Sequence, residues 1–210
     1  MAGFFLSGGA LCGMDDNWDA ETLGVSGCAR CPALVESRSR IVDGTGPATA
    51  DLLFVGEAPG ETEDERGEPF AGRSGDVLDD ALRDAGLARA DVRITNCVRC
   101  RPPGNRDPTA EERGNCLCYL ERELAAVDPE LVVALGKVPA EHLLGRSVAV
   151  TAEAGDIGTL SATDDNWPVL VSVHPAATLY DPGQRDVLST AMERAAEQVG
   201  SGGQSTFDAF

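Results

Sequence analysis

Polar side chains that could do chemistry follow the ends of four apolar stretches of the chain. The stretches are Leu52–Val55, Val92–Thr95, Leu131–Leu135 and Pro168–Val173, and they are followed by Glu57-Ala58, Asn96, Gly136-Lys137 and His174-Pro175. A carboxylate directly after a buried strand is costly without a role, and an amide or imidazole there can bind a polar ligand. Singly, an Asn after a strand is usually a turn residue and a His before Pro usually belongs to a capped loop. Together they predict one shared site.

The elements between these stretches have the patterns of helices. Residues 74–86, 109–127, 137–144 and 184–199 are predicted to be helical, whereas 146–166 is predicted to form short antiparallel or loop structure. Uniformly apolar strands that alternate with helices indicate an α/β fold, a three-layer α/β/α sandwich with a central four-stranded parallel sheet. In such folds ligands bind beyond the carboxyl ends of the strands, where the four polar sets fall.

A long segment rich in Gly, Pro and carboxylates, FVGEAPGETEDERGEPFAGRSG, spans residues 54–75. Its length and its prolines favour an ordered binding loop. Glu61 and Glu65 are expected on a solvated face. Phe70 is either a plug in the core or an aromatic platform at a pocket rim, and its local pattern favours the plug.

Seven cysteines in a chain expected to be cytoplasmic suggest metal binding or catalysis before disulfides. Cys28 and Cys31 form a C-x-x-C pair that opens a short helix to about Arg38. Four more cysteines, Cys97, Cys100, Cys116 and Cys118, lie in and after an Arg-rich loop. The first pair and two of these thiols make a four-thiolate site, suited to zinc or to an iron–sulfur cluster. Cys97, which continues a strand, could equally be a small core residue.

The bulk composition fits one globular domain over residues 28–200 in a chain of 210. Residues 1–27 are expected to be an extension, of which 1–13 precede an alternative start at Met14, and 201–210 a disordered tail. The net charge of −18 with a single lysine, Lys137, indicates adaptation to high salt, so it does not exclude DNA as a partner. No segment is apolar and long enough to cross a membrane, and we expect a cytoplasmic monomer.

Five motifs resemble those of the family 4, iron–sulfur uracil-DNA glycosylases. They are CARC, VGEAPGETEDERGEPFAGRSG, ITNCVRCRPPGNRDP with Cys116, ELVVALG and SVHPAATL, which occur in the family's order over residues 28–180. The resemblance implies a monofunctional enzyme that hydrolyses the N-glycosidic bond of deoxyuridine in single- or double-stranded DNA and so initiates base-excision repair. It also suggests replication-clamp or repair proteins as partners.

The same resemblance implies a structural [4Fe–4S] cluster on Cys28, Cys31, Cys100 and Cys116, while Cys12, Cys97 and Cys118 have no counterpart. In the family's pattern Phe70 stacks on uracil, Asn96 reads its polar edge and His174 donates to its O2 atom. Backbone at Glu57-Ala58 contacts the base and the water. Water activation is left open between Glu57, Glu63 and backbone groups, with Glu63 slightly ahead, and Asn105 matches a further position tied to activity.

Some positions depart from the pattern or extend it. Related families have Asp at Ala58, and family 4 often has an aromatic and then a basic residue where this chain has Ala177 and Tyr180. The predicted DNA contacts are Arg73, Arg101, Arg106 and Lys137. Two alternatives stay open: a non-catalytic uracil- or DNA-binding module of the same fold, and a zinc-stabilised α/β protein that acts on free nucleotides.

Overall fold

The computed structural model describes residues 17–162 and 166–202. The expected extension residues 1–13 and the expected tail from residue 203 onward lie outside the described residues. Within the described ranges, no helix combines the length and the apolar composition that a bilayer crossing requires.

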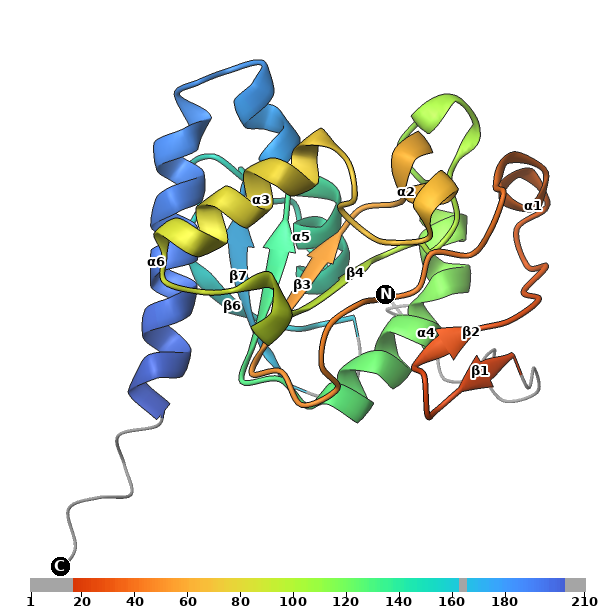
Figure 1. The fold of residues 1–210 in the computed structure, drawn as a ribbon, viewed down its shortest axis with the longest axis horizontal. Helices are drawn as coiled ribbons and strands as arrows, with labels where there is room; N and C mark the ends of the chain where they lie inside the picture. The colour runs from red at the N-terminus through yellow and green to blue at the C-terminus, as the bar shows by residue number, and fades with distance from the viewer. Residues whose placement is uncertain (1–16, 163–165, 203–210) are drawn as a thin grey trace, which may run out of the picture.

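A five-stranded sheet forms the centre of the fold (Figure 1). Four strands are parallel, in the order β4 (Arg93–Asn96), β3 (Leu52–Gly56), β5 (Leu131–Leu135) and β7 (Pro168–Ser172). This confirms the predicted parallel sheet. The fifth strand, β6 (Ile157–Thr159), pairs antiparallel with β7 at the edge. It lies within residues 146–166, for which short antiparallel or loop structure was predicted, but its place as a fifth strand of the central sheet was not predicted because its three residues lack an apolar run.

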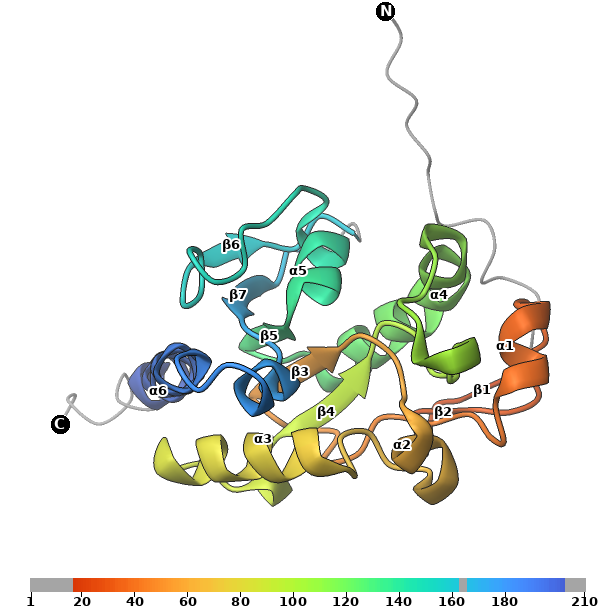
Figure 2. The ribbon, with the colours of Figure 1, turned by 90° about the horizontal axis from the view of Figure 1, so that it is seen from above.

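Helices cover both faces of the sheet, as predicted (Figure 2). Side chains that alternate along each strand divide the core in two. On one face, Leu53 and Val55 pack in a cluster with residues of α4 (Ala110–Val127) and α5 (Lys137–Leu144). On the other face, Leu52 and Phe54 pack in a cluster with residues of α3 (Arg73–Asp84) and α6 (Gln184–Gly202).

The segment between β3 and α3 contains a short helix that the sequence did not predict. This helix, α2 (Glu61–Arg66), starts after Gly60 and ends at Gly67, which has a left-handed φ of 82°. The Glu63 carboxylate accepts the backbone N–H of Gly60 and so caps the helix. The remaining helical segments are short: α1 (Pro32–Ser37), predicted after Cys31, and the 3₁₀ helices η2 (Arg89–Asp91), η3 (Pro103–Asn105) and η4 (Pro175–Leu179).

The first described residues form a small antiparallel hairpin of β1 (Trp18–Asp19) and β2 (Gly24–Val25). Leu23 and Val25 of this hairpin are buried, and the Trp18 ring stacks on Tyr119 of α4 at 6.5 Å between centroids. Residue Thr45, further along, makes an isolated antiparallel bridge to Ile94 and so lies along the free edge of β4. Residues 17–45 thus pack onto the same body as the sheet.

A buried ion-pair network joins these parts. Both carboxylate oxygens of Glu123, a fully buried residue of α4, are paired: Oε2 lies 2.6 Å from an Arg99 nitrogen and Oε1 lies 2.7 Å from Nε of Arg93. Arg99, which is 2% exposed, also pairs with Asp43 at 2.7 Å and donates to the carbonyl of Leu23. Four segments that are distant in sequence, at residues 23, 43, 93–99 and 123, therefore meet in one network.

Replacing Glu123 with Gln should lower the free energy of unfolding by about 3–5 kcal/mol, because Arg93 and Arg99 each lose a charged partner in the core. Urea denaturation followed by circular dichroism measures this difference. The control is Glu130→Gln at an exposed position, for which we expect a change within about 0.5 kcal/mol. Equal effects of the two substitutions would contradict the role assigned to the network.

Candidate active site

A cavity of about 490 Å³ opens at the carboxyl ends of the parallel strands, where the sequence predicted a site. Three of the four polar sets expected there contribute to it, since Glu57, Ala58, Asn96 and His174 line it and Lys137 does not. The complete lining is Glu57, Ala58, Gly60, Glu63, Phe70, Ser74, Asn96, Asn105, His174, Ala176 and Tyr180. All seven of the residues predicted for catalysis or uracil binding are among them.

The base of the cavity depends on a glycine at the end of β3. Gly56 pairs with Asn96 across the sheet, and a Cβ atom at Gly56 would lie 2.6 Å from Cε2 of Phe70 and also collide with Oδ1 of Asn96. Only a residue without a side chain lets the amide and the ring approach each other at this point. The Asn96 side chain is buried but borders the cavity, and within the described residues its amide makes no hydrogen bond.

Phe70 is both of the alternatives that the sequence left open. It is 6% exposed and packs in the core cluster of α3 and α6, yet its ring also lines the cavity. The ring stacks on His174 with centroids 5.6 Å apart and an interplanar angle of 27°. The backbone of Phe70 has a left-handed φ of 52°, and Gly75 leaves room for its carbonyl. A strained turn of this kind is held by its surroundings and fixes the ring position.

The tautomer of His174 is set by the backbone. Nδ1 of this residue accepts a hydrogen bond of 3.1 Å from the N–H of Ala176, at the start of η4. Burial lowers the pKa of His174 to about 4, so the imidazole is neutral at physiological pH. A neutral ring whose Nδ1 is an acceptor carries its proton on Nε2. His174 is therefore a neutral N–H donor at the cavity.

Two carboxylates of the cavity differ in their surroundings. The pKa of Glu57 is raised to about 7, mainly by burial and then by the carboxylate of Asp107, while the positive charge of Arg113 opposes the shift. Glu63, in contrast, accepts backbone hydrogen bonds on both oxygens, from Gly60 at 3.1 Å and from Gly72 at 3.3 Å. Glu57 can thus gain or lose a proton near neutral pH, and Glu63 connects two parts of its own loop.

The expected solvated face of α2 is confirmed, because Glu61 and Glu65 are exposed. Asn105, the remaining predicted site residue, lies in η3 with a left-handed φ of 55°. Its side-chain oxygen accepts a hydrogen bond of 2.7 Å from Nε of Arg101, and Arg101 also pairs with Glu61 at 3.2 Å. These contacts connect the Arg-rich loop to α2 across the cavity mouth.

The four cations predicted to contact DNA are held to different degrees. Arg106 is bound through two nitrogens to Glu112, at 2.7 and 2.8 Å, and so helps to cap α4. The ion pair of Lys137 with Glu141 is long, at 3.8 Å, and both side chains are partly exposed. Arg73 at the start of α3 makes no ion pair with any residue of the described ranges. Arg73 and Lys137 can therefore approach a phosphate without breaking a short ion pair.

Four cysteine thiols come together on the side of the molecule away from β6. Burial raises the pKa of the Cys31, Cys100 and Cys116 thiols, and the charge of Cys28 acts on each of them in the same direction. In residues 17–162 and 166–202, no three His, Cys, Asp or Glu side chains converge as ligands of a single metal ion. A [4Fe–4S] cluster has a different requirement, because each of its four irons takes one thiolate. The four cysteine sulfurs therefore lie around the cluster and do not converge on a single ion. The donor set fits that group.

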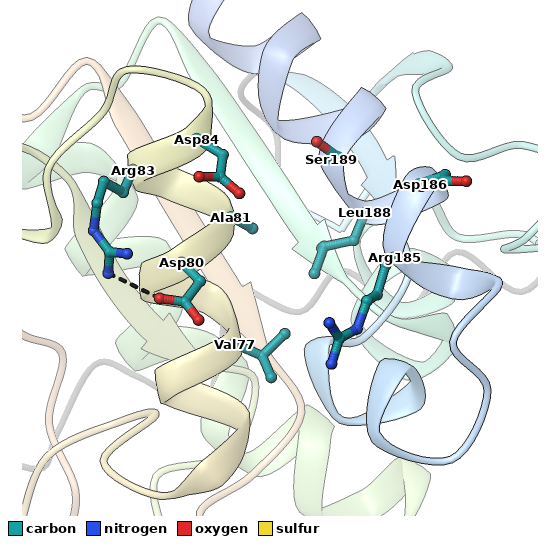
Figure 3. Close-up of a pocket in the computed structure, with 9 residues that line it drawn as sticks. All are labelled: Val77, Asp80, Ala81, Arg83, Asp84, Arg185, Asp186, Leu188 and Ser189. Atoms are coloured by element: carbon teal, nitrogen blue, oxygen red, sulfur yellow. Dashed lines mark ion pairs between the residues drawn. The ribbon is translucent and has the colours of Figure 1, made fainter.

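A second cavity, of about 450 Å³, lies between α3 and α6 and contains none of the predicted site residues (Figure 3). Val77 and Leu188 point into it from opposite helices, and at its border Arg83 pairs with Asp80 at 2.9 Å. Both partners of that pair are well exposed. Its lining has neither an aromatic ring nor an amide side chain, and the cavity at the strand ends has both.

Sequence reasoning missed several residues around the first cavity. Asp107 and Arg113, which act on Glu57, were not singled out, and Ser74 was named only as the start of a predicted helix. Tyr180 was noted as a departure from the family, but its place at the cavity and its 88% exposure were not foreseen. The signal that could have identified Asp107 is its position directly before Pro108 in the Arg-rich loop.

The fold and the cavity define an α/β protein with a pocket that is large enough for a nucleobase and is lined by an aromatic ring, an amide and a neutral imidazole at the strand ends. Comparison with known families agrees with the resemblance found in the motifs. The model of the uracil DNA glycosylase superfamily matches residues 44–198. The chain belongs to this superfamily.

Its relatives include several proteins named type-4 uracil-DNA glycosylase. The protein of Archaeoglobus fulgidus is 36% identical over 188 residues, which is 88% of this chain and 94% of the relative. The protein of Saccharolobus solfataricus is 36% identical over 194 residues, covering 89% and 88%. The protein of Thermotoga maritima is 41% identical over 133 residues, covering 63% and 69%. The family identified from the motifs is thereby confirmed.

The imidazole of His174 should stay neutral, with its proton on Nε2, down to about pH 5, because its pKa in the folded state is about 4. This pKa lies below that of the unfolded chain, so His174 contributes stability above about pH 6.5 that is lost as the pH falls through 4. Ring ¹⁵N chemical shifts of labelled protein measure both the charge and the tautomer. An imidazolium signal for His174 at pH 6 would contradict the assignment.

Proposed function

We propose that this protein is a monofunctional uracil-DNA glycosylase, which hydrolyses the bond between uracil and deoxyribose in DNA and leaves an abasic site. The observation that supports this most directly is the joint presence of Phe70, Asn96 and His174 in one cavity at the strand ends. The names of the type-4 relatives also support it. A base inside a duplex cannot reach such a cavity, so the target nucleotide has to rotate out of the stack.

Recognition of the base rests on Phe70 and Asn96. The Phe70 ring provides a face on which a flipped pyrimidine stacks. The Asn96 amide makes no hydrogen bond within the described residues, so its donor and its acceptor are both available for O4 and N3–H of uracil. Cytosine has a donor in place of O4 and an acceptor in place of N3–H, and it leaves this amide mismatched.

His174 stabilises the departing base. As the glycosidic bond breaks, negative charge develops on the uracil ring, and Nε2–H of His174 donates a hydrogen bond to its O2 atom. The backbone bond at Nδ1 and the stacking on Phe70 hold the imidazole before the substrate arrives. A donor fixed in advance needs no reorganisation during the reaction.

We assign the activation of the hydrolytic water to Glu57. A carboxylate with a pKa of about 7 is suited to accept a proton at neutral pH, and Glu57 borders the cavity. The two backbone hydrogen bonds of Glu63 favour a positioning role for that residue instead. This order differs from the one expected from the sequence, which placed Glu63 slightly ahead. Asn105 is proposed to act at the cavity mouth, held by Arg101.

We propose a [4Fe–4S] cluster on Cys28, Cys31, Cys100 and Cys116, which would brace the N-terminal segment against the Arg-rich loop when bound. The excess of acid in the whole chain, 35 Asp and Glu against 17 Lys and Arg, supports adaptation to a cytoplasm of high salt. At such ionic strength, phosphate contacts of Arg73 and Lys137 are screened. A monomeric state and replication-clamp partners stay predictions.

Purified protein should convert a labelled oligonucleotide that contains one uracil into alkali-cleavable product. Asn96→Ala and His174→Ala should each lower the single-turnover rate by about 10²–10³-fold, since each removes a group that contacts the base. Asn166→Ala, at an exposed residue of the loop before β7, is the control and should keep the full rate. Binding of the oligonucleotide by the unaltered chain without cleavage would favour the non-catalytic alternative.

The protein should be brown and contain about four irons per chain. Cys28→Ala should lose most of this iron, whereas Cys97→Ala, at a fully buried thiol outside the proposed ligand set, should keep it. Elemental analysis by plasma mass spectrometry and the visible absorption spectrum measure both. Zinc in place of iron would support the alternative of a zinc-stabilised protein.

A further inference from the structure

One buried carboxylate beside the cavity has no part in the proposed chemistry. Asp64 of α2 is 1% exposed and does not line the cavity. Its oxygens accept the backbone N–H of Ser39 at 2.8 and 2.9 Å and that of Arg40 at 3.3 Å. No ion pair of Asp64 occurs within the described part of the chain. A carboxylate at this depth is stabilised by the backbone donors that it binds, so these bonds are strong and specific.

The residue before Ser39 is held by the cysteines. The guanidinium of Arg38 donates to Sγ of Cys100 at 2.9 Å and to the carbonyl of Cys28 at 2.6 Å. Arg38 is also the residue at which α1 ends, and its backbone N–H bonds to Leu34. Three consecutive residues, 38–40, therefore contact two of the cysteine segments at one end and α2 at the other. In Figure 1, α2 lies between α1 and the sheet, and Figure 2 shows it beside the start of α3.

On its other side α2 holds the loop that forms part of the cavity wall. Glu63, next to Asp64, accepts the N–H of Gly60 and of Gly72, and these two glycines enclose the stretch that carries Phe70. A helix of six residues has little stability of its own, so its position depends on what it is attached to. Asp64 binds residues 39–40, and the adjacent Glu63 binds the loop that lines the cavity. Helix α2 therefore links these two segments.

We propose that residues 38–40 form a strut through which the cysteine segments position the cavity, with Arg38 as its anchor at the cysteines and Asp64 as its anchor on α2. Asp64 is thus a positioning residue, because it contacts neither the substrate nor the reacting atoms. The inference rests on the proposed function of the cavity. Small displacements of a preorganised site lower the rate strongly, so a released α2 slows excision.

Asp64→Ala tests the strut directly, and Asp64→Asn, which keeps one acceptor oxygen, should give a smaller effect of the same kind. Hydrogen–deuterium exchange should become faster in peptides that cover residues 57–75 and stay unchanged in β5. The single-turnover excision rate should fall about tenfold for Asp64→Ala, with KM for DNA and iron content retained.

The control is Asp19→Asn, which alters another carboxylate that accepts two backbone N–H groups, those of Glu21 and Thr22 in the hairpin turn. It should change neither exchange over residues 57–75 nor the excision rate. Unchanged exchange in Asp64→Ala would overturn the strut, and faster exchange with a full excision rate would overturn the positioning role. If the unaltered chain excises no uracil, the proposed function fails, and the exchange measurement still decides the strut.

A double substitution tests whether both anchors belong to one strut. Arg38→Gln removes the bonds to Cys100 and Cys28, and it should accelerate exchange over residues 57–75 in the same way as Asp64→Ala. Because opening either end releases the same segment, the double variant should exchange no faster than the faster single variant. Effects that multiply in the double variant would show two independent contacts and overturn the continuous strut.

Discussion

The arrangement of the molecule depends on the buried carboxylate of Glu123. Two guanidinium groups, from β4 and from the cysteine-bearing loop, need this counter-charge because neither can be left alone in the core. Asp43 and the carbonyl of Leu23 complete the surroundings of Arg99. One requirement for charge balance therefore fixes how the N-terminal hairpin, the loop of Cys97–Cys100 and α4 meet, and with them the places of the thiols.

The cavity obeys a different constraint, which is close approach without side chains. Gly56 lets the Phe70 ring lie against the Asn96 amide, and Gly75 accommodates the turn at Phe70. The ring in turn fixes the imidazole of His174, whose tautomer is set by one backbone N–H. Each group proposed to touch uracil is thus placed by the backbone or by another ring, and this is the preorganisation that catalysis of leaving-group departure requires.

How far the sequence predicts this structure depends on the range of the forces involved. The strand ends with Glu57, Asn96 and His174 were predictable, since parallel strands bring their carboxyl ends to one edge whatever the details of packing. Helix α2 was not, because glycines and prolines around it hide a helix that side-chain capping and distant bonds hold. The partners of Arg99 could not be predicted either, because they are distant in the sequence. A carboxylate at position 123, among the apolar residues Leu120, Leu124 and Val127, indicates a buried ion pair but does not identify its cation.

Both edges of the central sheet are short: β6 at one edge has only three residues, and Thr45 pairs along β4 at the other. An unpaired strand edge invites a strand of another molecule, and repulsion between highly charged proteins usually keeps such molecules apart. At molar salt that repulsion reaches only about 3 Å, so the acidic surface gives little protection against self-association. Short edges supply this protection instead by geometry, which ionic strength does not weaken.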